Sequence, residues 1–501
     1  MKITRLLILL SVFVLAKNLQ AQTYTTTNIC TGLQYPVAFD FLPDNRIILT
    51  QKGGTTGMAT NAQIKVYDSN FSYIGVFYDL SDSVNADFER GLLGITADPD
   101  FNTNHYIYTY YVHLYNSSER LRIVRFTENN NVGTNPAVIF DLDITSYNIA
   151  GNHVGGNLHF RPSDPNHIYF TIGDLAYHQT SAGNYASMLT LPFGKTLRIG
   201  KDPVPAGYDV HSVGGFGCNV PTDNPYYDDG NPATGNCDII WSYGHRNPFD
   251  FCFSPVSDSM YSSENGLNAW DEMNMIHRGA NYGWNTCEGF YMNSSTTTLC
   301  NYPGSVLPLE DWANPPALTG ILYYSGQVMP EFDNHVLVAD NDFARIYDLT
   351  MGNAPAYDTV LNRVTWQDLA GGLTTMKEGT DGCIYAMKGG YTTSGLIYRI
   401  CPQGLGEEDF INPYFSFSQN VPNPFTTTTT LKYTMKQDAS ATIVLYDMFG
   451  REVSVLADGM QAQGAHELTI DAQKLQLAPG TYFCSMESNG SVQSVKIVVA
   501  E

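Results

Sequence analysis

The chain has 501 residues and a formal net charge of −23 at pH 7, with 43% hydrophobic and 13% aromatic residues. This length exceeds one ordinary domain, so two or more folded units are expected. The acidic charge repels nucleic acid and anionic membranes, which argues against nucleic acid as a partner. It also supplies carboxylates for calcium, a cation that prefers oxygen ligands.

Residues 1–21 are typical of a secretion signal peptide. Lys2 and Arg5 precede an apolar stretch from Leu6 to Ala16, and Ala21 offers a small residue for cleavage. The stretch is shorter than the roughly twenty residues that a membrane-spanning helix needs, and no other stretch approaches that length. A buried N-terminal helix is the alternative. We therefore expect a secreted protein without a transmembrane segment.

Between residues 25 and 401 a weak pattern recurs, in which two runs of alternating apolar residues flank a turn rich in Pro, Gly, Asp or Ser. The clearest copy is NLHFRPSDPNHIYFTIGD at residues 157–174, and five further copies begin at residues 38, 94, 249, 335 and 374. Such alternation predicts antiparallel hairpins with one buried face. Six similar units, each long enough for four strands, favour an all-β fold, a six-bladed β-propeller. A large β-sandwich is the alternative, although it would not need such similar units.

The composition changes after residue 401. Residues 402–410 are expected to form a linker, and residues 411–501 a small C-terminal β-sandwich, because five further alternating runs follow. The motifs VPNPF (421–425), YDMFGREV (446–453) and LAPGTY (477–482) resemble the C-terminal sorting domain of the type IX secretion system. This resemblance implies the type IX secretion machinery as a partner and a secreted or cell-surface location. An adhesion-type sandwich would share the strand pattern but would not need the three motifs together.

Nine cysteines in an exported chain suggest disulfides. Two pairs bracket polar loops and a third would join the two ends of the central region, so the expected bonds are Cys218–Cys237, Cys287–Cys300 and Cys30–Cys401. Cys252, Cys383 and Cys484 remain, so at least one thiol is expected to be free.

Two short motifs carry residues suited to catalysis. His153 lies before Gly155 and Gly156, and its unperturbed pKa near 6.5 allows it to accept a proton at neutral pH. Arg246 and Asn247 precede a proline that favours an extended backbone, and an arginine fork and an amide suit carboxylate and quinone oxygens. A structural histidine and a salt bridge at the rim of the propeller are the alternatives.

An acidic run follows. Glu264, Asp271 and Glu272 surround the glycine-containing segment 265–268, and carboxylates with backbone carbonyls in such a loop are typical calcium ligands. The spacing is not that of an EF-hand. A solvated acidic turn is the alternative.

Several ordered motifs together resemble the glucose/sorbosone dehydrogenase family, the soluble quinoprotein sugar dehydrogenases, which are six-bladed propellers. The motifs are ERGLLGITADPDF (89–101), NHVGGNLHF (152–160), GKTLRI (194–199), SYGHRNP (242–248), ENGLNAWDEMN (264–274) and NYGWN (281–285). The resemblance covers residues 25–401. It implies an enzyme that oxidises a sugar or another alcohol with pyrroloquinoline quinone (PQQ) and calcium.

The resemblance also implies roles for individual residues. His153 matches the family's proton acceptor, and Glu89, Arg246, Asn247 and Tyr291 match positions that contact the quinone. The backbone carbonyls of Gly266 and Leu267 match ligands of the cofactor's calcium, and Glu272 with the Tyr282 carbonyl matches a second, structural calcium site.

The chain departs from the family at three places. Glu89 stands where relatives have a glutamine, Asp342 where they have a lysine, and segment 371–379 keeps only Lys377 where they have arginines. Because PQQ carries three carboxylates, these changes weaken its attraction to the site. They favour the alternative function, a non-catalytic secreted propeller that binds a glycan or a protein.

Overall fold

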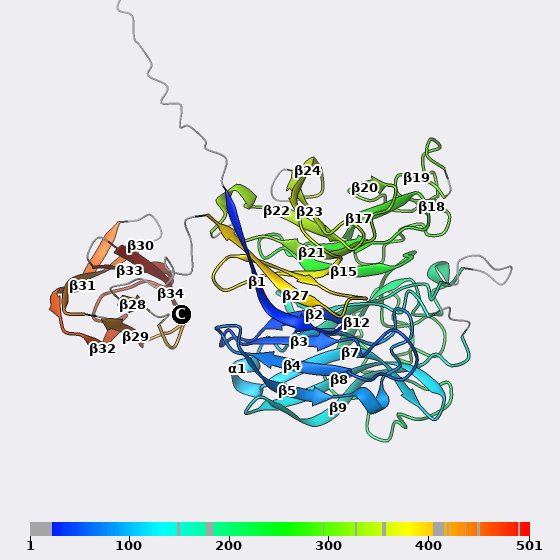
Figure 1. Cartoon of the computed structure of the whole chain (residues 1–501), viewed down its shortest axis with the longest axis horizontal. Helices are drawn as coiled ribbons and strands as arrows, with labels where there is room; N and C mark the ends of the chain where they lie inside the picture. The colour runs from blue at the N-terminus through cyan, green and yellow to red at the C-terminus, as the bar shows by residue number, and fades with distance from the viewer. Residues whose placement is uncertain are drawn as a thin grey trace, which may run out of the picture. The chain divides into compact units, whose positions relative to one another are not determined.

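The computed structural model describes residues 23–147, 151–176, 184–293, 295–325, 328–352, 357–403, 415–417, 420–435, 437–447, 451–488 and 491–500. The expected signal peptide and most of the expected linker lie outside these ranges. The chain divides into a large unit, Thr26–Ile400, and a small unit that contains the C-terminal strands (Figure 1). In the described part of the chain, no helix is long and apolar enough to cross a membrane.

Six antiparallel sheets of four or five strands build the large unit. The first sheet contains β2 (Pro36–Phe41), β3 (Ile47–Gln51), β4 (Gln63–Tyr67) and β5 (Tyr73–Asp79). The second contains β6 (Leu92–Ala97), β7 (Tyr106–Tyr115), β8 (Ser118–Asn129), β9 (Val132–Asp143) and β13 (Phe216–Gly217). The third contains β10 (Leu158–Arg161), β11 (Asp164–Ile172), β12 (Lys195–Gly200) and β14 (Ile240–Tyr243). The fourth sheet contains β15 (Pro248–Phe253), β16 (Met260–Glu264), β17 (Trp270–Ile276) and β20 (Glu310–Ala313). The fifth contains β21 (Leu318–Tyr323), β22 (His335–Asp340), β23 (Arg345–Met351) and β24 (Val360–Asp368). The sixth contains β25 (Leu373–Glu378), β26 (Ile384–Lys388), β27 (Gly395–Pro402) and β1 (Tyr24–Leu33).

The six sheets form a closed ring. Each first strand (β2, β6, β10, β15, β21 and β25) contacts the first strand of the next sheet, and β25 contacts β2. The ring is closed by the N-terminal strand β1, which pairs with β27 as the outermost strand of the last sheet, visible where blue meets yellow in Figure 1. An all-β propeller fold is thereby confirmed.

Apolar side chains between neighbouring sheets form the cores of the ring. Strand β3 is buried at every position, because both of its faces pack against other strands. Val37, Leu93 and Leu158, from three consecutive first strands, belong to one buried cluster. The six repeats predicted from alternation therefore become sheets stacked face to face, as burial of both faces requires.

Strand direction determines where side chains of different sheets meet. Successive strands of each sheet are antiparallel, so the connection from the second to the third strand and the connection to the next sheet emerge at the same end of the ring. We call this the loop-rich end. It gathers, among others, the segments around residues 52, 89, 153, 174, 246, 265, 341 and 391.

Several short elements lie in the connections between the strands of the ring. They are α1 (Phe101–Asn104), the 3-10 turns Ser81–Ser83, Tyr185–Ser187 and Pro330–Phe332, and a small hairpin of β18 (Cys287–Glu288) and β19 (Tyr291–Met292). The hairpin lies in the long connection between β17 and β20.

The small unit contains two sheets. One is β28 (Phe415–Phe417), β29 (Thr428–Met435) and β32 (Gly464–Asp471); the other is β30 (Ala439–Asp447), β31 (Glu452–Gln461), β33 (Gly480–Ser488) and β34 (Ser491–Val499). Residues of both sheets, among them Leu431 and Leu445, form a core of their own. A small β domain is confirmed.

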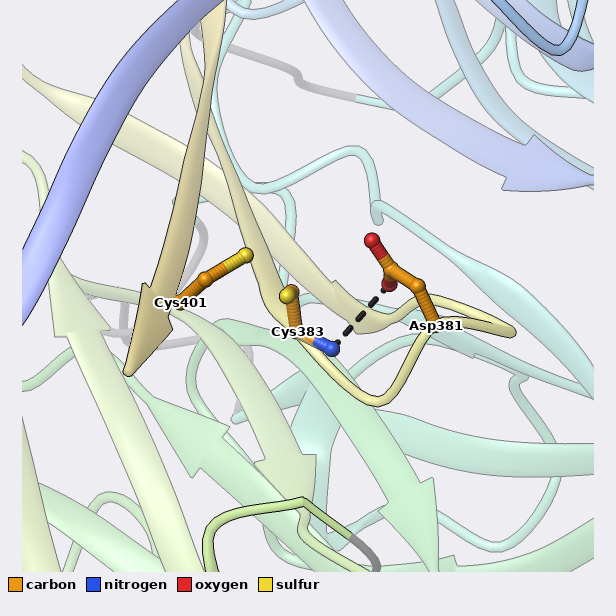
Figure 2. Close-up of side chains that lie close together, drawn as sticks. All are labelled: Asp381, Cys383 and Cys401. Carbon is orange, nitrogen blue, oxygen red and sulfur yellow. Dashed lines mark hydrogen bonds between the residues drawn. The ribbon is translucent and has the colours of Figure 1, made fainter. Parts of the chain in front are cut away.

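The disulfides differ from the prediction. Cys287 and Cys300 are bonded as expected, but Cys218, Cys237 and Cys30 are free. Cys383 and Cys401 are both disulfide-bonded, and as the only remaining cysteines they are each other's partner. They follow in register the pair Ile384 and Ile400 of β26 and β27, and Figure 2 shows their side chains side by side. Cys401 thus bonds within its own hairpin, and backbone pairing of β1 closes the ring.

Candidate functional site

A cavity of about 250 Å³ opens at the loop-rich end of the ring. Its polar lining comes from five of the six sheets and comprises Lys52, Glu89, Asn247, Asn265, Thr319, Asn341, Asp342, Thr374 and Tyr391. Gly155 and Gly156 lie against it as well. A cavity lined by loops of a closed ring therefore lies where several of the sequence motifs meet.

His153 lies beside this cavity and is held by a carboxylate. Its Nδ1 is 2.6 Å from Oδ1 of Asp174, while its backbone N–H donates to Oε2 of Glu89 at 2.6 Å. The other Asp174 oxygen accepts from Nε1 of Trp284 at 2.9 Å. Because Nδ1–H faces the carboxylate, Nε2 is the nitrogen left to accept a proton.

The two glycines after His153 allow close packing of the backbone. A Cβ at Gly155 would collide with the carbonyl oxygen of Thr171, and a Cβ at Gly156 with that of Phe249. The glycines therefore let the loop that carries His153 pack against neighbouring backbone. They line the cavity as a consequence.

Arg246 and Asn247 lie between the third and fourth sheets. Asn247 lines the cavity, and Nη1 of Arg246 donates to the carbonyl of Asn265 at 2.9 Å. Nε of Arg246 is buried without a hydrogen-bond partner. Burial lowers the pKa of Arg246, while the carboxylates of Asp174, Glu288, Glu89 and Asp271 favour its charge. The acids keep Arg246 charged, and its donor without a partner can serve an oxygen acceptor.

Two of the three carboxylates of the acidic run converge, since Glu264 and Glu272 both accept from Nδ2 of Asn274, at 3.2 and 3.0 Å. Glu264 also contacts Nδ1 of His245 and accepts from the Arg246 backbone N–H. Asp271 instead accepts from the backbone N–H groups of Gly266 and Leu318. Asp271 therefore holds the turn in place, and a calcium site that uses Glu264 and Glu272 stays a prediction.

Glu272 remains as a metal ligand candidate. It lies opposite Glu264 across β16 and β17, and accepts from Asn274 Nδ2 at 3.0 Å and from the Gly289 backbone N–H at 2.5 Å. Burial and the neighbouring Glu264 raise the pKa of Glu272 to about 8. Oδ1 of Asn274 is buried without a partner. A cation here would relieve both the repulsion and the unpartnered oxygen, so the oxygen donors fit calcium.

The other predicted residues lie around this cluster. The ring of Tyr282 stacks on His245 with centroids 4.6 Å apart, and its hydroxyl donates to the Met275 carbonyl. Tyr291 stacks on Trp270 with centroids 4.7 Å apart and is not among the described residues that line the cavity. Gly266 and Leu267 form the turn between β16 and β17.

Four residues at or beside these groups were not singled out from the sequence: Asp174, Trp284, Glu288 and Lys52. Trp284 and Glu288 stand in or just after the NYGWN motif, so their position signalled the site although their roles did not. Asp174 lies two residues after the end of β11 and 21 residues after His153, and nothing in the local sequence pairs the two. Lys377, the cation that the sequence left at the last sheet, lines a different cavity with His159 and Asp250.

Two other groups of acidic residues are weak candidates for a metal site. Asp381 is near the bonded Cys383 and Cys401, and it pairs with Arg399 at 2.8 Å (Figure 2). Asp228, Asp229 and Asp238 lie close together in the loop before β14. Their oxygens accept backbone and hydroxyl hydrogens of the same loop.

Comparison with known proteins agrees with this geometry. Residues 33–399 match the Glucose / Sorbosone dehydrogenase family, and residues 421–500 match the secretion system C-terminal sorting domain. The C-terminal match supports secretion or a cell-surface location.

Relatives include quinoprotein glucose dehydrogenase B of Acinetobacter calcoaceticus, 30% identical over 296 residues that cover 56% of each chain. Aldose sugar dehydrogenase YliI of Escherichia coli is 24% identical over 382 residues, 74% of this chain and 91% of the relative. The PQQ-bound aldose sugar dehydrogenase of Streptomyces coelicolor has the same fold, with a TM-score of 0.55 and 21% identity over 76% of this chain and 99% of that one. From residue 33 to residue 399, the chain belongs to the glucose/sorbosone dehydrogenase family.

Proposed function

We propose that the protein is a secreted quinoprotein dehydrogenase that oxidises a sugar or another alcohol with PQQ and calcium. The observation that carries this proposal is the His153–Asp174 pair beside a cavity lined by Asn247 and by Asn265, whose carbonyl accepts from Arg246. The names of the relatives agree in reaction class. An N-terminal signal peptide followed by type IX secretion is the proposed route of export.

The residues present fit the cofactor. Arg246, Asn247 and Lys52 offer donors to its carboxylate and quinone oxygens, while Glu89 and Asp342 in the same cavity oppose its charge. Calcium offsets that opposition. We assign the cofactor's calcium to the carbonyls of Gly266 and Leu267, and a structural calcium to Glu272 and the Tyr282 carbonyl. When bound, the quinone supplies the acceptor for the substrate's hydride.

The protein's own contribution is proton transfer and orientation. Nε2 of His153 accepts the proton of the substrate hydroxyl as the hydride leaves its carbon. The imidazolium formed is stabilised by Asp174, whose position is fixed by Trp284. Arg246 stabilises negative charge that develops on the acceptor's oxygens. Tyr291, stacked on Trp270, orders the loop beside the site and is proposed as an aromatic border to the cofactor.

The test is calorimetric titration of the calcium-loaded protein with PQQ, followed by dye-linked oxidation of aldoses. Saturable binding together with turnover is expected. Absence of quinone binding would contradict the proposal.

One observation favours a second candidate function. Glu89 and Asp342 line the cavity with three amides and Tyr391, a set that pairs well with hydroxyl groups and an aromatic-stacked sugar face. A non-catalytic protein that binds glycans uses such a surface directly. Binding of oligosaccharides by a protein that takes no quinone would establish this candidate instead.

A further inference from the structure

The turn between β16 and β17 is built around two carboxylates. The backbone N–H of Gly266 donates to Oδ1 of Asp271 at 2.8 Å. The next four backbone N–H groups, of residues 267–270, all point at Oε1 of Glu288, at 2.5, 3.1, 3.3 and 3.4 Å. The acceptor is a carboxylate oxygen, so the two shorter contacts are hydrogen bonds to a charged group and the longer two add electrostatic attraction.

This arrangement fixes the direction of the carbonyl groups. In a trans peptide the C=O and the N–H point in opposite directions, and the peptides 266–267 and 267–268 are not among the cis bonds. Since the N–H groups of Leu267 and Asn268 face Glu288, the carbonyls of Gly266 and Leu267 point away from it. Within the described residues, no donor contacts either carbonyl.

Glu288 is itself held rigidly. It is 2% exposed and forms the end of β18, next to Cys287 and its disulfide to Cys300. Its Oε2 is buried without a partner. The following residue, Gly289, donates its N–H to Glu272. A Cβ at Gly266 would collide with Oε1 of Glu288 and the carbonyl of Trp270, so the turn closes tightly around this carboxylate.

We propose that Glu288 is the positioning residue of a calcium site formed by the carbonyls of Gly266 and Leu267. It attracts the amides of the turn and thereby presents two carbonyl oxygens on the opposite side, as a hard cation requires. The inference rests on the proposed function, because two carbonyls leave most positions of a cation that takes 6–8 oxygen ligands to be filled by others, such as the carboxylates of PQQ. Glu288 touches neither substrate nor quinone, and acts through the turn.

The test is calcium titration of the full chain by calorimetry, with and without saturating PQQ, for wild type and four variants. Wild type is expected to bind two calcium ions in the presence of PQQ, and Glu272→Gln to lose one of them. Glu288→Ala should weaken the other by roughly 10–100-fold, the usual effect of losing a residue that orients metal ligands. Glu288→Gln keeps an oxygen acceptor and should retain most of the affinity.

Glu378→Ala is the matched control. Glu378 also accepts a backbone N–H, that of Ser325 at 2.8 Å, but lies in the last sheet, so both calcium affinities should be unchanged. Hydrogen exchange at residues 267–270 provides a readout that needs no cofactor. These amides should lose protection in Glu288→Ala and keep it in Glu288→Gln.

Four results would overturn the proposal: one calcium ion in wild type whether or not PQQ is present, unchanged affinities in Glu288→Ala, an effect confined to the ion that Glu272→Gln also removes, or unchanged exchange of the turn. A wild type that binds two calcium ions but no quinone contradicts the proposed function alone, and the Glu288 comparison then remains decisive for the turn.

Discussion

The orientation of one imidazole determines what the cavity does. Asp174 uses Oδ1 for His153 and for the backbone N–H of Ala176, and Oδ2 for Trp284. A carboxylate held by three donors has a fixed orientation, so it orients the imidazole and leaves Nε2 as the nitrogen of the proposed base. The backbone of His153 is also unusual, with φ of 56°, a conformation uncommon for a residue with a side chain. The loop therefore holds the base in place before substrate arrives.

Replacement of the base is the most direct test at this scale. His153→Ala should lower dye-linked aldose oxidation by about 10²-fold or more, the usual contribution of a general base, with PQQ affinity largely unchanged. The matched control is His335→Ala. His335 makes the same kind of contact, 2.6 Å from Nδ1 to Asp348, at a strand start away from the cavity, and its loss should spare activity. A fully active His153→Ala variant would mean that another group takes the proton.

Lys52 supplies the cavity's own positive charge. It is the one Lys or Arg side chain among the described residues that line this cavity. Its Nζ donates to the carbonyls of Gly54 and Ala86, and lies 5.5 Å from the ring centroid of Tyr391. Burial lowers the pKa of Lys52 to about 8, although Asp87 and Glu89 favour its charge.

The consequence is a pH dependence of quinone binding. The ammonium is charged below pH 8 and loses its proton above it, so PQQ affinity should fall as the pH rises through about 8. Lys52→Met should weaken binding at pH 7 by roughly 1.5–3 kcal/mol, which is about tenfold or more in Kd, and should remove the pH step. Lys65→Met, on strand β4, is the control. A step that persists in Lys52→Met would assign it to another group.

At the level of residues, the sequence identified groups that titrate or donate but not their partners. His153, Glu89 and Asn247 lie at or beside the cavity as their motifs predicted. Asp174 was missed because its contact with His153 depends on how two sheet connections meet. The backbone partners of Glu264 and Asp271 were missed for the same reason, since they become visible only in the folded turn.

At the level of elements, alternation of apolar residues was a sufficient signal for strands but not for cysteine pairing. The strands fall where hairpins were expected because apolar runs and turn residues are local signals. Burial differs from the expected single buried face, since β3 is buried at every position whereas the outer strand β24 is largely exposed. Disulfides depend on strand register. Cys383 and Cys401 face each other only because Ile384 pairs with Ile400, whereas the expected partner Cys30 lies in β1 and is free.

The Cys383–Cys401 bond should stabilise the last hairpin. The double variant Cys383→Ser/Cys401→Ser should lose about 3 kcal/mol of unfolding free energy, the magnitude for a loop of this length, and its melting temperature should fall. Non-reducing peptide mapping should find Cys383 linked to Cys401. Cys30 should become alkylated in denaturant without a reductant. A disulfide-linked peptide that joins Cys30 to Cys401 would contradict the Cys383–Cys401 bond and support the pairing predicted from the sequence.

At the scale of the whole molecule, separate hydrophobic cores explain why the chain divides into two compact units. The buried cluster of the C-terminal unit contains residues from Phe415 to Val499 and none from the ring. The clusters of the ring contain none from the C-terminal unit. Separate cores of this kind are what allows domains to fold independently. The domain bounds at residues 25–401 and 411–501 remain predictions that truncation tests.

A chain that ends after Gln403 keeps all six sheets, including β1 and β27, which close the ring. It should therefore retain the melting transition of the ring and the PQQ titration of the full chain, while the transition of the C-terminal unit disappears. In cells it should no longer be exported by the type IX route, because the matched sorting region, residues 421–500, is gone. Cleavage of the purified full chain in the linker serves as the control, since it separates the units after folding. An aggregated truncation with intact cleavage products would show that the C-terminal unit is needed for the ring to fold, although not for the ring to remain folded.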